Sequence, residues 1–339
     1  MSERPPIHLN RRLSVAPMME WTDRHCRVFH RQFSRQALLY TEMVTASGVV
    51  LGEADWLYAH DTVEHPLALQ LGGSEPEMLA RAVALALPFG FAEINLNVGC
   101  PSDRVQSGAF GACLMRDPAL VAECVAEMIS AAGGADGPEI TVKCRIGVDD
   151  QAPERALPEF IDRVAAAGVR HFAIHARKAW LQGLSPKENR TIPPLDYDLV
   201  ARVKAARPEL AMSLNGGIGT LAEARAHLQR FDGVMIGRAA YHDPAGILGG
   251  ADALITGKPV PEVAPEAAVR GMFGYIETQL GAGARLGQIT RHMLGAFNGR
   301  PGARAWRRTL SEGAHLPGAG PELVERALAH VAPLEAAAE

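Results

Sequence analysis

Continuous apolar runs separated by amphipathic segments recur between residues 14 and 237. The runs lie at residues 14–18, 38–43, 66–71, 93–98, 140–146, 171–176, 211–215 and 233–237. Their apolar positions are contiguous rather than alternating, which is typical of strands that are buried on both faces of a parallel sheet. The pattern therefore predicts eight parallel strands with helices between them.

Helix-start signals fall between these runs. Ser74-x-x-Glu77 and Thr220-x-x-Glu223 have the form of capping boxes, and Asp117-Pro118 places an N-cap residue before a proline at the first helical position. In the helix that starts at Pro118, apolar positions form one stripe that includes Cys124. We therefore expect Cys124 to be a core residue.

The order of the elements favours a (β/α)₈ TIM barrel in the α/β class, which typically takes about 250 residues. A doubly wound nucleotide-binding sheet is disfavoured, because no Gly-x-Gly-x-x-Gly follows the first run. A turn-rich linker at 256–261 is followed only by helical patterns, such as 267–280 and 321–331. We expect a catalytic barrel domain at 1–256 and a small all-α domain at 262–339.

The composition indicates in which cellular compartment the protein acts. The 339 residues are 47% hydrophobic, and the first fourteen contain no apolar leader segment. The longest apolar stretch, 82–92, is too short to span a membrane. The five cysteines are scattered without a Cys-x-x-Cys pair, which argues against a disulfide framework or a metal site and favours the reducing cytoplasm.

Arginine is concentrated in one segment of the predicted helical domain. Residues 278–311 contain no acidic residue and no lysine but six arginines: Arg285, Arg291, Arg300, Arg304, Arg307 and Arg308. The formal net charge of the whole chain is −4. Because the arginine side chain suits phosphate groups and stacks on bases, this segment indicates a surface that contacts nucleic acid.

Candidate chemistry lies where the predicted strands end, because TIM barrels carry their active sites at the carboxyl ends of the strands. The residues at those ends are Pro17, Met18, Met19, Gln70, Asn97, Cys100, Lys143, Arg145, His175, Asn215, Gly216, Gly217, Gly237 and Arg238. Glycines after both of the last two strands, one of them followed by an arginine, indicate a phosphate-binding site.

Cys100 is the candidate reactive residue. Gly99 permits backbone angles that are closed to other residues, and Pro101 fixes the following φ. We expect this turn to present the thiol on a stiff loop at a strand end.

Seven sequence motifs, six in the predicted barrel and one in the predicted helical domain, resemble those of the tRNA-dihydrouridine synthases, and specifically the A-type. The motifs are Ala16-Pro17-Met18-Met19, Trp21-Thr22-Asp23-Arg24-His25-Cys26-Arg27, Asn95-x-Asn97-x-Gly99-Cys100-Pro101-Ser102, His175-Ala176-Arg177, Asn215-Gly216-Gly217, Gly237-Arg238 and Pro301-Gly302-Ala303-Arg304-x-Trp306-Arg307-Arg308. They cover both predicted domains.

The resemblance implies an FMN-dependent enzyme that reduces D-loop uridines of tRNA, at positions 20 and 20a, to 5,6-dihydrouridine. NADPH (or NADH) would reduce the flavin, which delivers hydride to uridine C6, and Cys100 would then protonate C5. An ordinary cysteine thiol is still largely protonated at neutral pH, so it can supply this proton. By the same likeness FMN would be held by Pro17, Met18, Met19, Gln70, Lys143, His175, Asn215, Gly216, Gly217, Gly237 and Arg238.

The resemblance also implies tRNA as the macromolecular partner. From the sequence itself we expect no membrane association, because no apolar stretch is long enough, and no obligate protein partner, because a barrel with a helical cap of this size can bury its core alone. We expect tRNA contacts from Asn97, from Lys187 and Arg190 in the basic loop after the sixth strand, and from Arg304 and Arg307.

Two other functions stay open at this point. A flavin-dependent TIM-barrel dehydrogenase of a free pyrimidine would share the phosphate glycines and the cysteine acid, but it has no use for the arginine segment. A tRNA-binding or folding factor with little catalysis would need the basic surface but not Cys100 together with the flavin residues.

Overall fold

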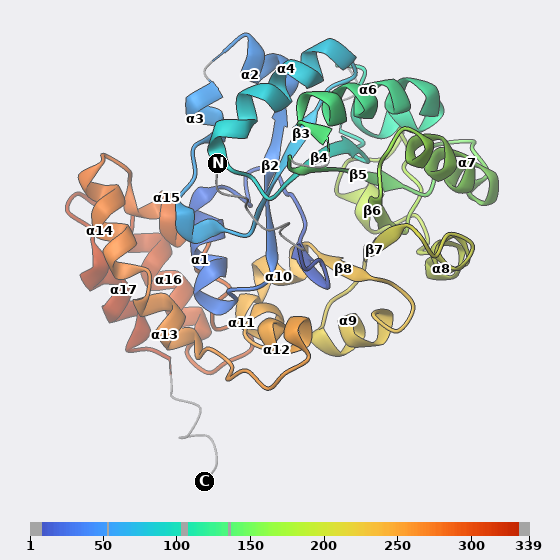
Figure 1. Ribbon diagram of the computed structural model, residues 1–339. Coiled ribbons are helices and arrows are strands. Elements are labelled where there is room, and N and C mark those ends of the chain that lie inside the picture. The colour runs from blue at the N-terminus through green and yellow to red at the C-terminus, as the bar shows by residue number, and fades with distance from the viewer. Residues whose placement is uncertain (1–8, 53, 103–107, 135–136, 332–339) are drawn as a thin grey trace.

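The computed structural model describes residues 9–52, 54–102, 108–134 and 137–331. Eight parallel strands close into a barrel in chain order, β1 to β8, and β1 pairs with β8 (Figure 1). The strands are β1 (Leu13–Val15), β2 (Leu38–Thr45), β3 (Leu67–Gly72), β4 (Glu93–Val98), β5 (Glu139–Arg145), β6 (His171–His175), β7 (Ala211–Asn215) and β8 (Gly233–Ile236). The predicted TIM barrel is confirmed.

Every strand coincides with a predicted apolar run, but β1 ends earlier than expected, at Val15. Ala16 still donates a backbone hydrogen bond to the carbonyl of Ile236, whereas Pro17 has no N–H with which to continue the ladder. The chain therefore leaves the barrel at Pro17.

Most of the core lies between the barrel and its surrounding helices. Ala16, Leu38, Tyr40, Ala68, Ala173 and Met235 form a separate, smaller buried cluster. Because residues two apart on a strand share a face, this cluster lies in the barrel interior. The side of the interior that β4 and β5 line is polar: Glu93, Asn95 and Thr141 are fully buried there.

The helices between and after the strands surround the barrel (Figure 1). They are α1 (Arg24–Phe33), α2 (Ala46–Val50), α3 (Ala54–Tyr58), α4 (Pro76–Ala86), α6 (Pro118–Ala131), α7 (Pro153–Ala166), α8 (Tyr197–Ala205), α9 (Leu221–His227), α10 (Arg238–His242), α11 (Pro244–Leu248) and α12 (Ala251–Thr256), with short 3₁₀ helices at Thr62–Glu64, Leu87–Phe89, Gly111–Arg116 and Glu188–Arg190.

Two of the three predicted helix starts are confirmed. Asp117 caps α6 by accepting a hydrogen bond from the N–H of Leu120, and the Thr220 capping box forms. The capping box at Ser74 is wrong, because α4 begins at Pro76 with Glu75 as its N-cap residue and without a side-chain cap. Cys124 is fully buried, as expected of a core residue.

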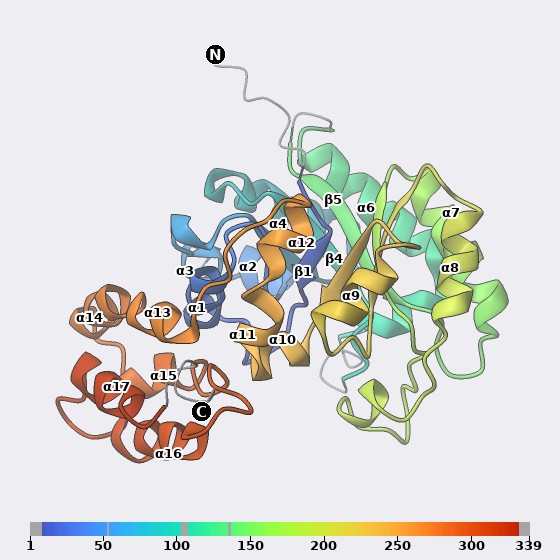
Figure 2. The same cartoon turned by 90° about the horizontal axis from the view of Figure 1, so that it is seen from below.

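Five further helices form a group beside α1 in both views (Figures 1 and 2). They are α13 (Pro265–Arg270), α14 (Phe273–Gly281), α15 (Leu286–Thr290), α16 (Ala303–Gly313) and α17 (Pro321–Leu328). The single helix expected over 267–280 is wrong. It is interrupted at Gly271, where an added Cβ would lie 2.3 Å from Gln32 Oε1 of α1, so this point of the chain packs tightly against the barrel side.

The all-α character of this region is confirmed, while the division into domains at 1–256 and 262–339 stays a prediction. Within the described ranges, no helix is long and apolar enough to cross a membrane.

Candidate active site at the carboxyl end of the barrel

Strand register brings the expected site residues together at one end of the barrel. Lys143 lies opposite Asn97 in the β4–β5 pair. Arg145, His175 and Asn215 follow one another across β5, β6 and β7. These side chains, which are far apart in the sequence, therefore form neighbouring rows at the carboxyl ends of the strands.

The Cys100 turn is held from two sides. The side-chain oxygen of Asn97 accepts hydrogen bonds from the backbone N–H groups of Gly99 (3.0 Å) and Cys100 (2.9 Å). On the other side, Arg145 Nε donates to the carbonyl of Gly99 at 3.1 Å. The thiol is partly exposed, and its Sγ lies 3.4 Å from Ser102 Oγ. A stiff turn with an accessible thiol is thus confirmed as a local structure.

The reason expected for Gly99 is wrong. Its φ lies outside the left-handed region, so the turn needs no unusual backbone angle. An added Cβ would lie 3.4 Å from the backbone of Lys143 and Cys144. These are ordinary van der Waals distances, so the packing of β4 against β5 does not explain the glycine.

Positive charge gathers around Cys100. Burial, together with the charges of Arg145 and Arg190, lowers the pKa of Lys143 to about 8, while the Cys144 and Cys100 thiols act in the opposite direction. Burial and the nearby charge of Arg238 lower the pKa of Arg190. Such a group of cations favours an anionic ligand at this end of the barrel.

His175 is a buried histidine with an unused ring nitrogen. Its Nδ1 atom has no hydrogen-bond partner in the part of the chain that the structure describes. Burial, followed by the charges of Arg145 and Lys143, holds the pKa of His175 well below its usual value. A neutral imidazole with one free nitrogen is suited to a hydrogen bond with a ligand.

The two glycines after β7 are required by conformation and by packing. Gly216 and Gly217 have φ values of 107° and 78°, in the region that favours glycine. A Cβ on Gly216 would lie 3.0 Å from the His175 ring, and one on Gly217 would lie 2.6 Å from the Tyr197 hydroxyl. That hydroxyl donates to the carbonyl of Gly216 at 2.6 Å, which fixes the turn.

The turns after β8 and β1 lie side by side. A Cβ on Gly237 would be 3.5 Å from Met18 Sδ. Arg238 begins α10 and donates to the carbonyl of Arg190 at 3.2 Å, which ties this turn to the loop after β6. Asn215 Nδ2 donates to the carbonyl of Met235 at 2.7 Å and links β7 to β8.

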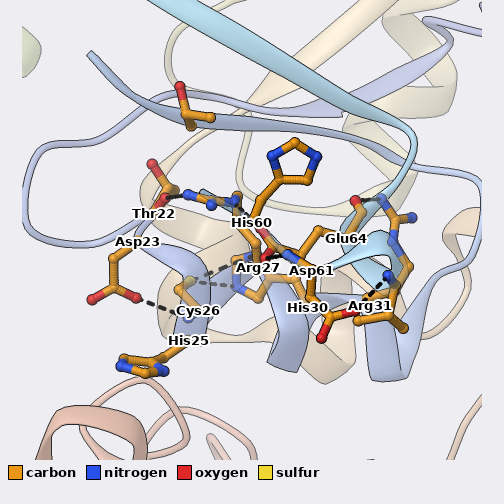
Figure 3. Close-up of polar contacts among 12 residues, drawn as sticks. Thr22, Asp23, His25, Cys26, Arg27, His30, Arg31, His60, Asp61 and Glu64 are labelled. Carbon is orange, nitrogen blue, oxygen red and sulfur yellow. Dashed lines mark hydrogen bonds and ion pairs between the residues drawn. The ribbon is translucent and has the colours of Figure 1, made fainter. Parts of the chain in front are cut away.

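The turn after β1 is anchored through α1. Met18 N–H donates to Thr22 Oγ1 at 2.9 Å, and the carbonyl of Thr22 accepts from Arg27 at 2.8 Å. Arg27 is buried against Glu64, with 2.5 Å between Nε and Oε2 (Figure 3). Pro17 and Met18 are half-buried and Met19 is 53% exposed, so Met19 has apolar surface to offer to a ligand.

Gln70 and Asn97 are already hydrogen-bonded to each other. Asn97 Nδ2 donates to Gln70 Oε1 at 2.8 Å, and both side chains are buried. The structure therefore gives Asn97 an internal role that the sequence did not indicate, as the residue that holds the Cys100 turn. Its contact with tRNA stays a prediction.

The loop after β6 contains an aromatic side chain that the sequence analysis did not select. Trp180 is 42% exposed, and Lys178 Nζ lies 4.9 Å from the centre of its ring. Buried Asn189 holds the backbone of this tryptophan. The backbone N–H of Trp180 donates to Asn189 Oδ1 at 2.7 Å, and Asn189 Nδ2 donates to the backbone carbonyl of Trp180 at 2.8 Å. An aromatic residue between basic ones was the available signal, since that pattern is typical of nucleic-acid surfaces.

Lys187 and Arg190 of the same loop are exposed at the surface, although the charged group of Arg190 is partly buried. Arg145 also reaches this loop by donating to the carbonyl of Asn189 at 2.9 Å. One buried arginine therefore connects the Cys100 turn with the loop that carries the expected tRNA contacts.

The arginine segment divides into residues that form ion pairs with other described residues and residues that do not. Arg291 pairs with Asp23 at 2.5 Å, and Arg300 pairs with Glu266 at 2.6 Å. Arg304 and Arg307 are exposed on α16 and take part in no ion pair with another described residue. They lie on the group of helices outside the barrel, so the structure does not bring them next to Cys100.

Asp23 is a second residue whose role only the structure reveals. Its carboxylate caps α1 by accepting from the N–H of Cys26 at 3.0 Å. The same carboxylate contacts Arg291 and, at 3.0 Å, His292 Nε2, both in the segment after α15. Asp23 thus links the turn after β1 to the helical region.

Comparisons with known proteins agree with this arrangement. The family described as dihydrouridine synthase (Dus) matches residues 14–332. The tRNA-dihydrouridine(20/20a) synthase of Xanthomonas axonopodis pv. citri is 59% identical over 317 residues, which cover 94% of this chain and 93% of that protein. The enzyme of the same name from Escherichia coli K12 is 55% identical over 333 residues, 98% of this chain and 95% of that one.

Among solved structures, morphinone reductase superposes with a TM-score of 0.51 at 13% identity, over 76% of this chain and 88% of that one. At this identity the likeness concerns the barrel fold alone. The family match and the relatives, by contrast, extend through the barrel and the helical region together. The chain belongs to the dihydrouridine synthase family.

Proposed function

We propose that this protein reduces uridines at positions 20 and 20a of the tRNA D-loop to 5,6-dihydrouridine, with bound FMN as cofactor and NADPH, or NADH, as reductant. The observation that carries this proposal is the 59% identity, over 94% of the chain, to an enzyme named tRNA-dihydrouridine(20/20a) synthase. A likeness of this extent includes both the end of the barrel around Cys100 and the exposed arginines of α16.

The residues present fit FMN. The unpartnered Nδ1 of His175 can bond to a flavin, and the cations around Lys143 suit its phosphate. At Gly216 and Gly217 a side chain would fill the space beside His175 and Tyr197, so the backbone N–H groups stay open to an anion. FMN would be held by Pro17, Met18, Met19, Gln70, Lys143, His175, Asn215, Gly216, Gly217, Gly237 and Arg238.

When bound, FMN would supply the hydride that reduces C6 of the uridine. Addition at C6 leaves negative charge at C5, and this carbon must gain a proton. The Cys100 thiol donates that proton from its Sγ, and the resulting thiolate regains one from water. The hydrogen bond that the Cys100 N–H donates to Asn97, and the one that Arg145 donates to the Gly99 carbonyl, keep the thiol in one place during the transfer.

A target uridine must leave the base stack before it can react, which costs on the order of a few kcal/mol. Contacts to the tRNA backbone from Lys187 and Arg190 offset this cost near the site, and Arg304 and Arg307 do so on α16. We assign catalysis and FMN binding to residues 1–256 and tRNA binding to residues 262–339. The protein would act in the cytoplasm and would need no obligate protein partner.

The test uses the purified protein with an unmodified tRNA transcript, and with free uracil and uridine monophosphate in parallel. We expect about one FMN per chain, NADPH oxidation that depends on the transcript, and dihydrouridine in the transcript only. Folded protein that stays colourless and takes up no added FMN would contradict the cofactor assignment. Reduction of the free pyrimidines alone would favour the metabolite dehydrogenase instead.

A further inference from the structure

A single chain of hydrogen bonds runs through the polar side of the barrel interior. Its members are consecutive inward-facing residues of β4, with neighbours from β3 and β5: Glu93, Thr141, Asn95, Gln70 and Asn97. Gln70, Asn95 and Thr141 are register partners across the three strands. The chain begins at Glu93, which is fully buried at the amino-terminal end of β4, and it ends at the Cys100 turn.

Every link in this chain has the same direction. The Thr141 hydroxyl donates to Glu93 Oε1 at 2.6 Å and accepts from Asn95 Nδ2 at 2.8 Å. Asn95 Oδ1 accepts from Gln70 Nε2 at 2.8 Å, and Gln70 Oε1 accepts from Asn97 Nδ2 at 2.8 Å. The side-chain oxygen of Asn97 is therefore the atom left to accept from the N–H groups of Gly99 and Cys100.

The direction is set at the Glu93 end. An ionised carboxylate can only accept hydrogen bonds, whereas an amide or a hydroxyl can be turned to do either. Because Glu93 can only accept, Thr141 must donate to it. Each amide further along the chain then has one orientation in which its NH₂ group meets an oxygen atom and its oxygen atom meets an N–H group; the reversed amide would place donor against donor and acceptor against acceptor. Reversal of the Asn97 amide would point its NH₂ group at the two N–H groups of the turn, which would then have no acceptor.

Glu93 is well suited to stay ionised in this position. Arg11 Nε lies 2.6 Å from its Oε2, and the Tyr40 hydroxyl donates to its Oε1. Burial raises the pKa of Glu93, but the Arg11 charge and the hydrogen bonds from Thr141 and Tyr40 outweigh burial, so its pKa lies below the usual value.

We propose that Glu93 and Thr141 are positioning residues, which act through the oriented Asn95–Gln70–Asn97 chain to set the conformation of the Cys100 turn. They touch no reacting atom. The part of this inference that concerns catalysis rests on the proposed function, because it takes Cys100 as the proton donor. The part that concerns the position of the thiol does not.

The decisive variant is Thr141→Val, which keeps the side-chain shape but removes the link between Glu93 and Asn95 and leaves the Arg11–Glu93 ion pair intact. Ser213→Ala is the matched control. Ser213 is equally buried in the barrel, and it bonds to His171 Nε2 at 2.9 Å, outside the chain. Both variants lack one buried hydroxyl, so they share any general loss of stability.

Two readouts are taken on the FMN-loaded protein. The first is the rate of Cys100 alkylation by iodoacetamide, measured by peptide mass spectrometry with the partly exposed Cys113 as the internal reference. The second is single-turnover reduction of tRNA. We expect Thr141→Val to alkylate faster at Cys100 than Ser213→Ala, and to reduce tRNA about 10–100-fold more slowly, since a small misplacement of a catalytic group has effects of this size. Reduction of the flavin by NADPH should change less.

Thr141→Ser keeps the hydroxyl and should restore both readouts. If Thr141→Val does not fold, Glu93→Gln takes its place, because Arg11 retains Glu139 at 2.6 Å as a partner and the amide no longer fixes the direction of the chain. Equal alkylation and equal tRNA reduction in the chain variant and in Ser213→Ala would overturn the inference. The two claims can also fail separately. If the wild-type protein reduces no tRNA, but Thr141→Val or Glu93→Gln still changes the alkylation of Cys100, the proposed function is refuted and the positioning role is not.

Discussion

Cys100 is the residue on which the proposed chemistry depends, and the sequence could predict its turn but not its supports. The Gly99-Cys100-Pro101 sequence indicates a turn because glycine and proline are local signals. The acceptor Asn97 is also close in sequence. Arg145, however, reaches Gly99 from β5, and the backbone of Lys143 and Cys144 beside Gly99 belongs to the same strand. Contacts between strands are not visible in a local pattern.

Cys100→Ala should leave FMN binding and reduction of the flavin by NADPH intact, while the reduction of uridine slows about 10²–10⁴-fold, the usual contribution of a positioned acid. Single-turnover measurements separate the two half-reactions. Cys113→Ala is the control, because that thiol donates to the carbonyl of Phe110 at 3.1 Å and makes no other hydrogen bond with a residue that the structure describes. Equal slowing of both half-reactions would mean that Cys100 supports flavin binding or folding rather than proton transfer.

Asp23 combines a helix cap with two contacts to the segment after α15. Burial raises its pKa, but the hydrogen bonds from His292, Cys26 N–H and Arg291 outweigh burial and hold the pKa of Asp23 well below its usual range. Because the pKa is lower in the folded than in the unfolded protein, the charge stabilises the fold above about pH 4 and this contribution disappears as the pH falls below that.

At pH 7 we expect Asp23→Asn, which can still cap α1, to lower the free energy of unfolding by about 1 kcal/mol, and Asp23→Ala to lower it by about 2 kcal/mol. Urea unfolding between pH 3 and pH 8 measures both differences. The difference between wild type and Asp23→Asn should shrink below about pH 4. A difference that grows toward acid pH would contradict this account of the ion pair.

At the scale of elements, the strands were the most predictable part of the fold. They are buried on both faces, so their apolar runs are continuous and the sequence contains a strong local signal. Helix boundaries depend more on packing. Pro76 moved the start of α4 beyond Ser74, and the helical pattern over 267–280 forms two helices, with Gly271 packed against Gln32 of α1 at the break.

The turn after β7 tests the proposed phosphate site. Gly217→Ala should fold with reduced stability and retain little of its FMN, because an added Cβ would lie 2.6 Å from Leu195 Cδ1 and from the Tyr197 hydroxyl and would displace the turn. Gly257→Ala is the control: its φ is also positive, at 68°, but nothing lies within 4 Å of the added Cβ. It should cost about 1 kcal/mol of stability and keep its FMN. FMN content and equilibrium unfolding measure both effects, and equal FMN content in the two variants would argue against this site.

At the scale of the whole molecule, the sequence indicated a basic surface over residues 278–311. It could not show which of the arginines there form ion pairs within the protein and which are left unpaired. Asp23 and Glu266, which neutralise Arg291 and Arg300, lie far away in the chain or on another helix. Only the fold shows that these two arginines hold the structure together and that Arg304, Arg307 and Arg308 are exposed. The proposed nucleic-acid surface therefore rests on fewer arginines than the segment 278–311 contains, because Arg291 and Arg300 are engaged in ion pairs.

The double variant Arg304→Ala/Arg307→Ala should bind tRNA more weakly, and the slope of log affinity against log salt should flatten by about 0.7–0.9 for each tRNA phosphate that the variant no longer neutralises. Arg202→Ala/Arg225→Ala removes the same charge from exposed positions on α8 and α9 and is the control. NADPH oxidation without tRNA should be unchanged in both. An unaltered affinity and salt slope in the α16 variant would show that these arginines are ordinary surface charge.

The most direct measurement is a map of dihydrouridine in tRNA from cells that lack this protein and from the same cells supplied with either the wild-type chain or Cys100→Ala. The account predicts that dihydrouridine disappears at positions 20 and 20a, returns with the wild-type chain, and does not return with Cys100→Ala. Dihydrouridine that persists at both positions without the protein, or that returns equally with Cys100→Ala, would contradict the central claim.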